Sequence, residues 1–168
     1  MRQGQTVIVD GYNVIHQSSR LRPLLDRNLE SARNGLIVQC SAWLSGKRHV
    51  RELVIVFDGD SAAAPYSSPP VSHVKVLYSR TGEKADDRIL SLLKACPEAG
   101  ECVIVSEDND ITQPAKQLGA CVLSAREFLE SPPRHQKQGQ VSDDAKTGLS
   151  PADVKSLNDD LRREWGIR

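Results

Sequence analysis

The chain has 168 residues, of which 39% are hydrophobic and 26% are charged, and its formal net charge is zero. This composition is typical of one globular domain with room for a tail. It excludes a nucleic-acid-binding surface that is basic over the whole molecule, though not a local basic patch. No apolar run approaches the roughly 18 residues of a membrane helix, and no secretion signal begins the sequence. We therefore expect a soluble cytoplasmic protein without a membrane partner.

Apolar periodicity predicts strands that alternate with helices along most of the chain. In chain order, strands are expected at residues 6–10, 52–58, 71–78, 101–106 and 120–123, and helices at residues 21–45, 85–95, 110–118 and 125–130. Loops are expected from Val14 to the first helix and at residues 59–70. This order favours an α/β fold with a mostly parallel central sheet and helices on both faces.

The composition changes at Ser131. Residues 131–149 are polar, contain a Pro-Pro pair and lack apolar periodicity, which is typical of a flexible linker. Residues 150–168 open with helix-start residues and carry an apolar stripe. They predict a C-terminal amphipathic helix that either docks on the core or binds a partner. The folded domain is therefore expected to comprise residues 1–130.

The four cysteines are not spaced as zinc ligands. Cys40 and Cys121 lie in apolar periodic segments and are predicted to be small core residues. Reduced thiols are the favoured interpretation, with a disulfide between Cys96 and Cys102 as the alternative.

Three of the predicted apolar strands end at or just before an aspartate. Asp10 follows the first strand, Asp58 the second, and Asp108 the strand at residues 101–106. Two further polar residues expected at these strand ends are Asn13 and Ser106, and Asp86 or Asp87, at the start of a predicted helix, joins the set. The carboxyl ends of parallel strands are where open α/β sheets place their ligand sites. An aspartate after a strand is also a common turn former, so each residue taken alone has an equally good structural explanation.

Carboxylates that converge without compensation repel one another and raise each other's pKa values. A divalent cation relieves this repulsion, and oxygen ligands without nearby histidine or cysteine favour magnesium or manganese. Such an ion, held with open positions, binds a phosphate oxygen and activates water. Hydrolysis of a phosphodiester is therefore the reaction class that this pattern favours.

Four stretches, in the right order, resemble the motifs of the NYN domain, the nuclease-like group of the PIN superfamily that includes the YacP-type bacterial proteins. They are Asp10-Gly11-Tyr12-Asn13-Val14-Ile15, Val54-Ile55-Val56-Phe57-Asp58-Gly59, the segment 81–89 with its Gly-Glu and Ala-Asp pairs, and the segment 103–111 with Ser106 and Asp108. The resemblance covers about residues 6–129. It implies a PIN-like three-layer α/β/α fold and a metal-dependent endoribonuclease that acts in RNA processing or in ribosome-associated cleavage of messenger RNA.

Carried onto this sequence, the resemblance implies metal ligands at Asp10, Asp86 and Asp108 for Mg²⁺ or Mn²⁺. Asn13 would orient Asp10 or a bound water. Asp58 is close enough in the motif to contribute, and two second choices are Asp87 and Asp110.

RNA as the partner also requires cations that contact phosphates. The best candidates flank the helix acid and are Arg80, Lys84 and Arg88. A second set, Lys47 and Arg48, follows the first predicted helix. Solvated surface charge is the favoured interpretation of each of these residues when it is taken alone. Tyr12 either stacks on a base or packs in the core.

The main alternative is an RNA- or ribosome-binding module that keeps the fold with weak or no catalysis. A phosphatase of the dehalogenase type, suggested by Asp58-Gly59-Asp60, is disfavoured because Tyr12 stands where that chemistry needs a second aspartate. A dinucleotide-binding domain is disfavoured because no Gly-x-Gly-x-x-Gly motif follows a strand.

Overall fold

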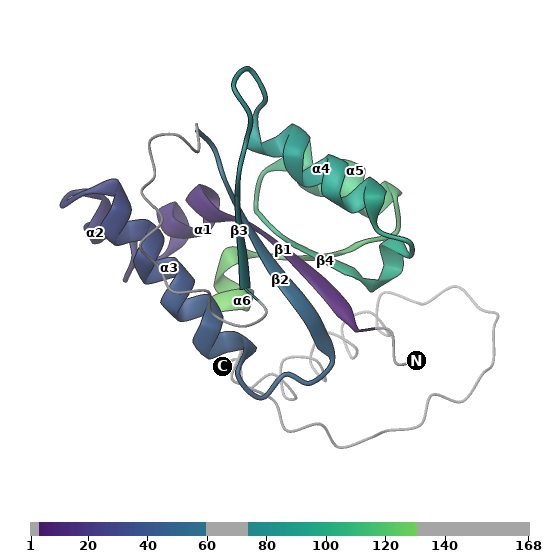
Figure 1. Cartoon of the computed structure of the whole chain (residues 1–168), viewed down its shortest axis with the longest axis horizontal. Coiled ribbons are helices and arrows are strands. Elements are labelled where there is room, and N and C mark those ends of the chain that lie inside the picture. The colour runs from purple at the N-terminus through teal and green to yellow at the C-terminus, as the bar shows by residue number, and fades with distance from the viewer. Residues whose placement is uncertain (1–3, 60–73, 131–168) are drawn as a thin grey trace, which may run out of the picture.

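The computed structural model describes residues 4–59 and 74–130 (Figure 1). Most of the predicted loop at 59–70, the predicted linker at 131–149 and the predicted final helix at 150–168 lie outside the described residues. No helix in the described part is long and apolar enough to cross a membrane.

A five-stranded sheet forms the centre of the fold, and all of its described strands run parallel in the order β3-β2-β1-β4-β5. The strands are β1 (Gln5–Asp10), β2 (Val50–Phe57), β3 (Val74–Tyr78), β4 (Cys102–Val105) and β5 (Cys121–Leu123). The apolar runs in β1, β2 and β4 are buried because helices cover both faces of the sheet, as parallel sheets require. The expectation of a mostly parallel α/β sheet is confirmed.

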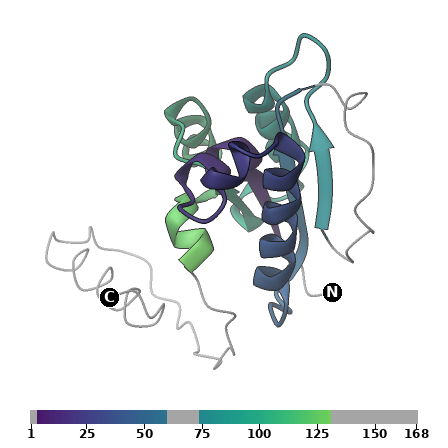
Figure 2. The ribbon, with the colours of Figure 1, turned by 90° about the vertical axis from the view of Figure 1, so that its left-hand side faces the viewer.

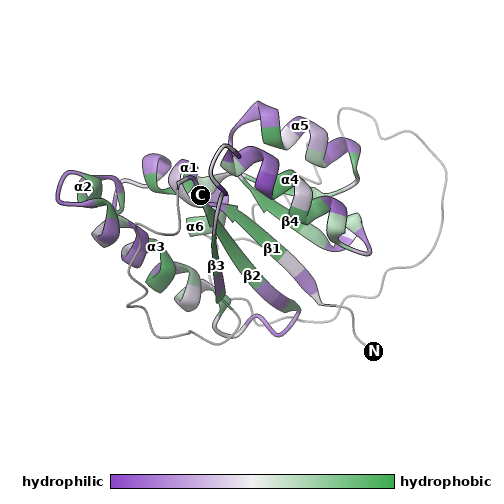
Figure 3. Ribbon diagram, turned by 45° about the horizontal axis from the view of Figure 1, so that its top comes forward, coloured by the Kyte–Doolittle hydropathy of each residue, from purple (hydrophilic) through white to green (hydrophobic). Residues whose placement is uncertain are grey.

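Six helices and one short 3₁₀ turn pack around this sheet in the described residues. They are α1 (Gly11–Gln17), α2 (Arg22–Leu25), α3 (Leu29–Leu44), α4 (Ala85–Ala95), η2 (Ala99–Glu101), α5 (Asn109–Gln117) and α6 (Ala125–Glu130). Alternate residues of β1 serve the two faces: Val7 and Val9 pack with α1, α3 and α6, whereas Ile8 packs with α4 and α5. The result is a three-layer α/β/α fold, with α1 and α3 in front of the sheet in Figure 2 and apolar strands between more polar helices in Figure 3.

The loop predicted from Val14 onward is wrong, because β1 runs directly into helix α1. Asp10 caps this helix by accepting a hydrogen bond from the backbone N–H of Asn13 at 3.4 Å, and Val14 and Ile15 are buried. The helix has only seven residues, too few to display a helical period.

The single long helix predicted from Leu21 is also wrong, because it is divided into α2 and α3. The break falls at Asn28, whose side-chain oxygen accepts the backbone N–H of Ser31 at 2.7 Å and caps α3. Apolar periodicity continues across this break because Leu24 of α2 and Leu36 of α3 pack in the same core.

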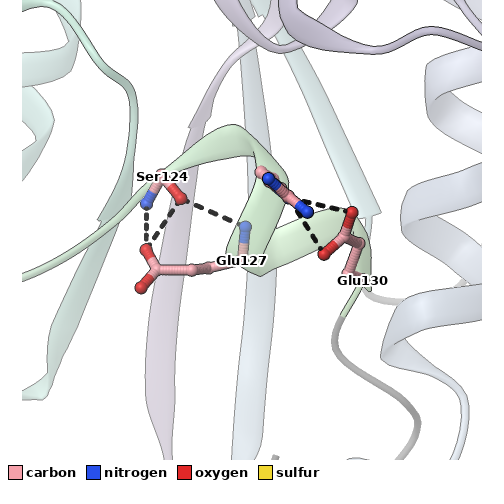
Figure 4. A network of polar contacts seen from close by, with 4 residues as sticks. Ser124, Glu127 and Glu130 are labelled. Atoms are coloured by element: carbon pink, nitrogen blue, oxygen red, sulfur yellow. Dashed lines mark hydrogen bonds and ion pairs between the residues drawn. The ribbon is translucent and has the colours of Figure 1, made fainter. Parts of the chain in front are cut away.

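The capping box predicted at the start of α6 is confirmed (Figure 4). The Glu127 carboxylate accepts hydrogen bonds from the backbone N–H and the hydroxyl of Ser124, each at 2.8 Å, and the Ser124 hydroxyl accepts the N–H of Glu127 at 3.1 Å. The helix then places the buried Phe128 ring 4.6 Å from the ring of Trp43 on α3. The helix predicted at residues 125–130 is therefore confirmed together with its capping contacts.

The cysteine predictions hold in part. Cys40 is fully buried in the core, as expected, whereas Cys121 is exposed because it lies on the edge strand β5. All four thiols are free, including those of Cys96 and Cys102.

Candidate active site

The chain leaves neighbouring strands β1 and β4 toward opposite faces of the sheet. The helix after β1, α1, packs on one face, and the helix after β4, α5, packs on the other. In parallel α/β sheets such a reversal opens a crevice at the carboxyl ends of the two strands, and ligands bind there. Asp10 ends β1 at this point, and Ser106 directly follows β4 on the other side.

Ser106 links the two aspartates at the reversal. Its hydroxyl donates to Oδ2 of Asp10 at 3.1 Å and accepts the backbone N–H of Asp108, also at 3.1 Å. The Asn13 side-chain oxygen accepts the backbone N–H of Glu107 at 3.0 Å. These bonds join the loop after β4 to the first turn of α1, so the positions of Asp10 and Asp108 depend on each other.

Both aspartates also cap the helix that follows them. The Oδ1 atom of Asp108 accepts the backbone N–H of Asp110 at 2.9 Å at the start of α5, as Asp10 does for Asn13 in α1. Capping explains why an aspartate directly precedes the helix in each case. It does not explain why the two carboxylates share one crevice.

Asp10 is held in conditions that disfavour its charge. The side chain is 8% exposed, and burial raises its pKa from 3.8 to about 6. Hydrogen bonds from Ser106 and from the N–H of Asn13 oppose this rise, and the charges of Asp86 and Asp108 add to it. Three carboxylates therefore act on one another at this edge of the sheet.

Helix α4 brings Asp86 to the same place from the face that carries α5. Partial burial raises its pKa, the charge of Asp108 raises it further, and the ammonium of Lys84 lowers it. Asp110 and Asp87 contribute smaller upward effects. Asp86 is half-buried whereas Asp87 is exposed, so the structure brings Asp86 toward the aspartates of the crevice and leaves Asp87 toward solvent.

Asp58 has a different local role. Its Oδ1 atom accepts the hydroxyl of Ser79 at 2.8 Å, and the same hydroxyl accepts the backbone N–H of Gly59 at 3.1 Å. Ser79 follows β3, and its own backbone N–H donates to the carbonyl of Phe57. The structure therefore engages Asp58 in joining the ends of β2 and β3.

The predicted phosphate contacts fall into two groups. Lys84, next to α4, is exposed and close enough to Asp86 to lower its pKa. Arg80 lies exposed in the preceding turn, which its backbone N–H closes by donating to the Glu83 carboxylate at 3.1 Å. Arg88 is half-buried on α4, and its Nε has no hydrogen-bond partner among the described residues.

The second group lies at the opposite edge of the sheet. Lys47 and Arg48 precede β2, so they lie at the amino ends of the strands, away from Asp10. Lys47 is buried, with its ammonium 4.2 Å from the ring centre of Trp43. The structure does not bring these two residues to the acidic edge.

A cluster that the sequence did not reveal lies beside the acidic edge, and we name it the Arg33 cluster: Arg33, Tyr12, Phe57 and Tyr78. The guanidinium carbon lies 5.6, 5.5 and 5.2 Å from the three ring centres, respectively. Its Nε donates to the Tyr12 hydroxyl at 2.8 Å, and Nη2 donates to the same oxygen. Arg33 lies 21 residues from Tyr12 on the polar side of a helix, so no local pattern predicts the contact.

Gly11 allows this cluster to pack against the start of α1. A Cβ at this position would lie 2.4 Å from a ring atom of Phe57. The sequence suggested that Gly11 provides a sharp turn, but its backbone φ is not positive. The close approach of the Phe57 ring, and not a left-handed turn, requires glycine here.

The donor set at the acidic edge suits a hard divalent cation, because Asp10, Asp86 and Asp108 offer oxygen ligands and repel one another without one. Among the described residues, however, no three His, Cys, Asp or Glu side chains are placed so that they could hold one ion together.

The fold and the site define a three-layer α/β protein that carries aspartates at the reversal point of its parallel sheet, where proteins of this class bind ligands. The chain belongs to the YacP-like NYN domain family, whose sequence model matches residues 7–166. It is 30% identical over 127 residues to the YacP protein of Bacillus subtilis strain 168. The aligned region covers 73% of this chain and 72% of that protein. Family membership supports a nuclease-like, RNA-related function at this coarse level.

Two crystal structures of Rae1 (YacP) from Bacillus subtilis resemble the fold. A single-residue mutant form matches with a TM-score of 0.60 and 28% identity over 74% of this chain and 72% of that one. A second structure matches with a TM-score of 0.62 and 23% identity over 94% of this chain and 78% of that one, and at this identity it supports the fold alone.

Proposed function

We propose that the protein is a metal-dependent endoribonuclease that hydrolyses phosphodiester bonds of RNA, with messenger RNA on the ribosome as one candidate substrate. The observation that carries this proposal is the meeting of Asp10, Asp86 and Asp108 at the reversal point of the sheet, where the charges of Asp86 and Asp108 raise the pKa of Asp10 and the charge of Asp108 raises the pKa of Asp86. Capping accounts for single aspartates, whereas a shared cation accounts for all three.

In this proposal Asp10, Asp86 and Asp108 hold Mg²⁺ or Mn²⁺. Such an ion, when bound, supplies a Lewis acid for the phosphate and a nucleophile from water. The ion also removes the repulsion between the three carboxylates, so we expect them to move closer together when it binds.

The protein's own groups orient the site. Ser106 fixes the Asp10 carboxylate and the backbone of Asp108, and the Asn13 side-chain oxygen holds the loop after β4 by accepting the N–H of Glu107. Lys84 is the cation best placed to attract a phosphate, because its charge already reaches Asp86. Arg80, which precedes α4, and Arg88, which lies on it, are proposed to contact further phosphates of the RNA.

An RNA-binding module with weak or no catalysis is the second candidate. It is favoured by one observation: the described acidic side chains do not form a group that could hold an ion as they are placed. In that case the acidic edge would be structural, and the helix caps made by Asp10 and Asp108 would be its whole role.

Cleavage of a mixed pool of single-stranded and structured RNA by the purified full chain tests the first candidate. We expect cuts in Mg²⁺ or Mn²⁺, none in chelator, and a loss of at least about 100-fold in Asp10→Asn, since that variant removes a ligand charge. Asp26→Asn, an exposed aspartate at the end of α2, is the matched control and should cut normally.

Two results would contradict this proposal. Equal cleavage by Asp10→Asn and the unaltered chain would contradict the proposed site, because the activity would then lie elsewhere. RNA binding by both proteins without cleavage, on free RNA and on translating ribosomes alike, would instead favour the binding module.

A further inference from the structure

Within residues 4–59 and 74–130, the cation of the Arg33 cluster has no acidic partner. Ion pairs join Lys75 to Glu52 and Arg126 to Glu130, and neither pair includes Arg33. Three aromatic rings and one phenol oxygen surround the guanidinium instead. Ring faces attract a cation but do not neutralise its charge, so Arg33 keeps a full positive charge at this position.

The guanidinium also has donors to spare. It carries five N–H groups, and two of them donate to the Tyr12 hydroxyl. The other three have no hydrogen-bond partner among the described residues. The buried side-chain nitrogens without a partner in this part of the chain are those of Trp43 and Arg88, so Nη1 of Arg33, which makes no hydrogen bond there, is accessible to solvent.

The position of the cluster relates it to the acidic edge. Phe57 and Tyr78 are the last residues of β2 and β3, and Tyr12 lies in the first turn of α1, two residues after Asp10. Arg33 therefore lies along the same carboxyl edge of the sheet, on the side of β2 and β3. The rings and the Tyr12 hydroxyl fix the guanidinium plane before any ligand arrives, which lowers the entropy cost of binding.

We infer that Arg33 binds a backbone phosphate of the RNA, next to the phosphate that enters the acidic site. A guanidinium in a fixed position, with Nη1 accessible to solvent, is suited to donate to a phosphate oxygen, and no carboxylate of the described residues competes for its charge. This inference rests on the proposed function for the identity of the ligand, but it concerns binding and not cleavage. It adds a contact on the far side of the acidic edge from Lys84.

Binding of a fluorescein-labelled single-stranded RNA, measured by anisotropy in chelator over a range of salt concentrations, tests the inference without requiring catalysis. We expect Arg33→Gln to weaken binding on the order of three- to tenfold and to reduce the salt slope by about 0.7, the value for one lost phosphate contact on a single strand. Arg33→Lys, which keeps the charge, should retain most of the slope. Lys94→Gln removes one exposed charge from the last turn of α4, at the opposite edge, and should leave the slope unchanged.

Two results with the Arg33 variants would overturn the inference. One is an unchanged affinity and slope in Arg33→Gln. The other is weaker binding by both Arg33 variants with an unchanged slope and a lowered melting temperature, which would show that Arg33 only supports the packing of three rings. Failure of the unaltered chain to cleave RNA would overturn the nuclease and leave these binding results intact. A chain that binds no RNA at all would overturn both proposals.

Discussion

At the scale of single residues, Ser106 connects the two helix-capping aspartates, Asp10 and Asp108, within one site. The sequence predicted it among the polar groups at the carboxyl ends of the strands, but indicated no role for it. Its hydroxyl is buried, and it contacts both the Asp10 carboxylate and the backbone of Asp108. A side chain that orients a ligand without binding the metal is expected to affect activity nearly as strongly as the ligand itself.

Ser106→Ala is therefore expected to reduce RNA cleavage by about 10- to 100-fold. It should also lower the free energy of unfolding by about 1–2 kcal/mol, because the Asp10 carboxylate and the Asp108 N–H lose a buried partner. Cleavage rates and urea denaturation measure the two effects. Ser91→Ala, an exposed serine on α4, is the control. Full activity in Ser106→Ala would show that the two aspartates hold their positions independently.

The raised pKa of Asp10 makes a prediction for stability. The folded pKa is about 6 and the ordinary value is 3.8, so the folded chain binds this proton more tightly than the unfolded chain. Stability from this group is fully present below about pH 3.8 and is lost as the pH rises through about 6. Asp10→Asn stays neutral at every pH. Its free energy of unfolding, relative to that of the unaltered chain, should therefore rise by about 1 kcal/mol from pH 5 to pH 8.

Urea denaturation in chelator at the two pH values measures this difference. Chelator is needed because a bound cation would lower the pKa of Asp10 and mask the effect. The same stability difference between Asp10→Asn and the unaltered chain at pH 5 and at pH 8 would show that burial does not raise the pKa of this carboxyl group.

At the scale of elements, the packing of α1 on the end of β2 fixes the direction in which Asp10 and Asn13 point. Gly11 makes this possible because the Phe57 ring occupies the space of a side chain. Phe57 in turn contacts the rings of Tyr12 at 5.1 Å and Tyr78 at 5.9 Å. The first turn of α1 is therefore placed by contacts with two neighbouring strands.

Gly11→Ala is expected to lower the free energy of unfolding by about 1–3 kcal/mol, because the new methyl group overlaps a fully buried ring. It should also reduce cleavage, since α1 must shift and carries Asn13 with it. Gly100→Ala is the control: its nearest neighbour atom is 3.9 Å from the new Cβ, so a change within about 0.5 kcal/mol is expected. Equal stability of the two variants would mean that the ring moves aside without cost.

Sequence patterns predicted elements well where the signal is local. The apolar runs that became β1, β2 and β4 and the capping box of α6 are such signals. Helix α1 was missed because seven residues show no period, and the break at Asn28 was missed because one core collects leucines from both α2 and α3. Local signals fail where tertiary packing decides the outcome.

At the scale of the whole molecule, topology explains which site residues could be predicted. Asp10 and Asp108 follow parallel strands, so a sheet with those strands as neighbours brings them together without further information. The family resemblance favoured Asp86 over Asp87, but the residue pattern alone could not make this choice, because it depends on the rotation of α4 against the sheet. The sequence also could not show which edge of the sheet Arg33 and Lys47 occupy, since their positions depend on where α3 begins and ends.

The same topology separates the two edges of the sheet. The acidic residues, the Arg33 cluster and Lys84 gather at the carboxyl ends of the strands, whereas Lys47 and Arg48 lie at the amino ends. With zero net charge over the whole chain, any attraction for RNA must come from such local asymmetry. An RNA strand is therefore expected to follow the carboxyl edge.

Titration of Mn²⁺ and Mg²⁺ into the full chain by calorimetry, comparing Asp86→Asn with Asp87→Asn, tests the metal site most directly. The two aspartates are neighbours in sequence, but one is half-buried beside Asp108 and the other is exposed. We expect the unaltered chain and Asp87→Asn to bind the ion with affinities within about threefold, and Asp86→Asn to bind at least about tenfold more weakly. No binding by the unaltered chain, or equal losses in the two variants, would contradict a metal site built from Asp10, Asp86 and Asp108.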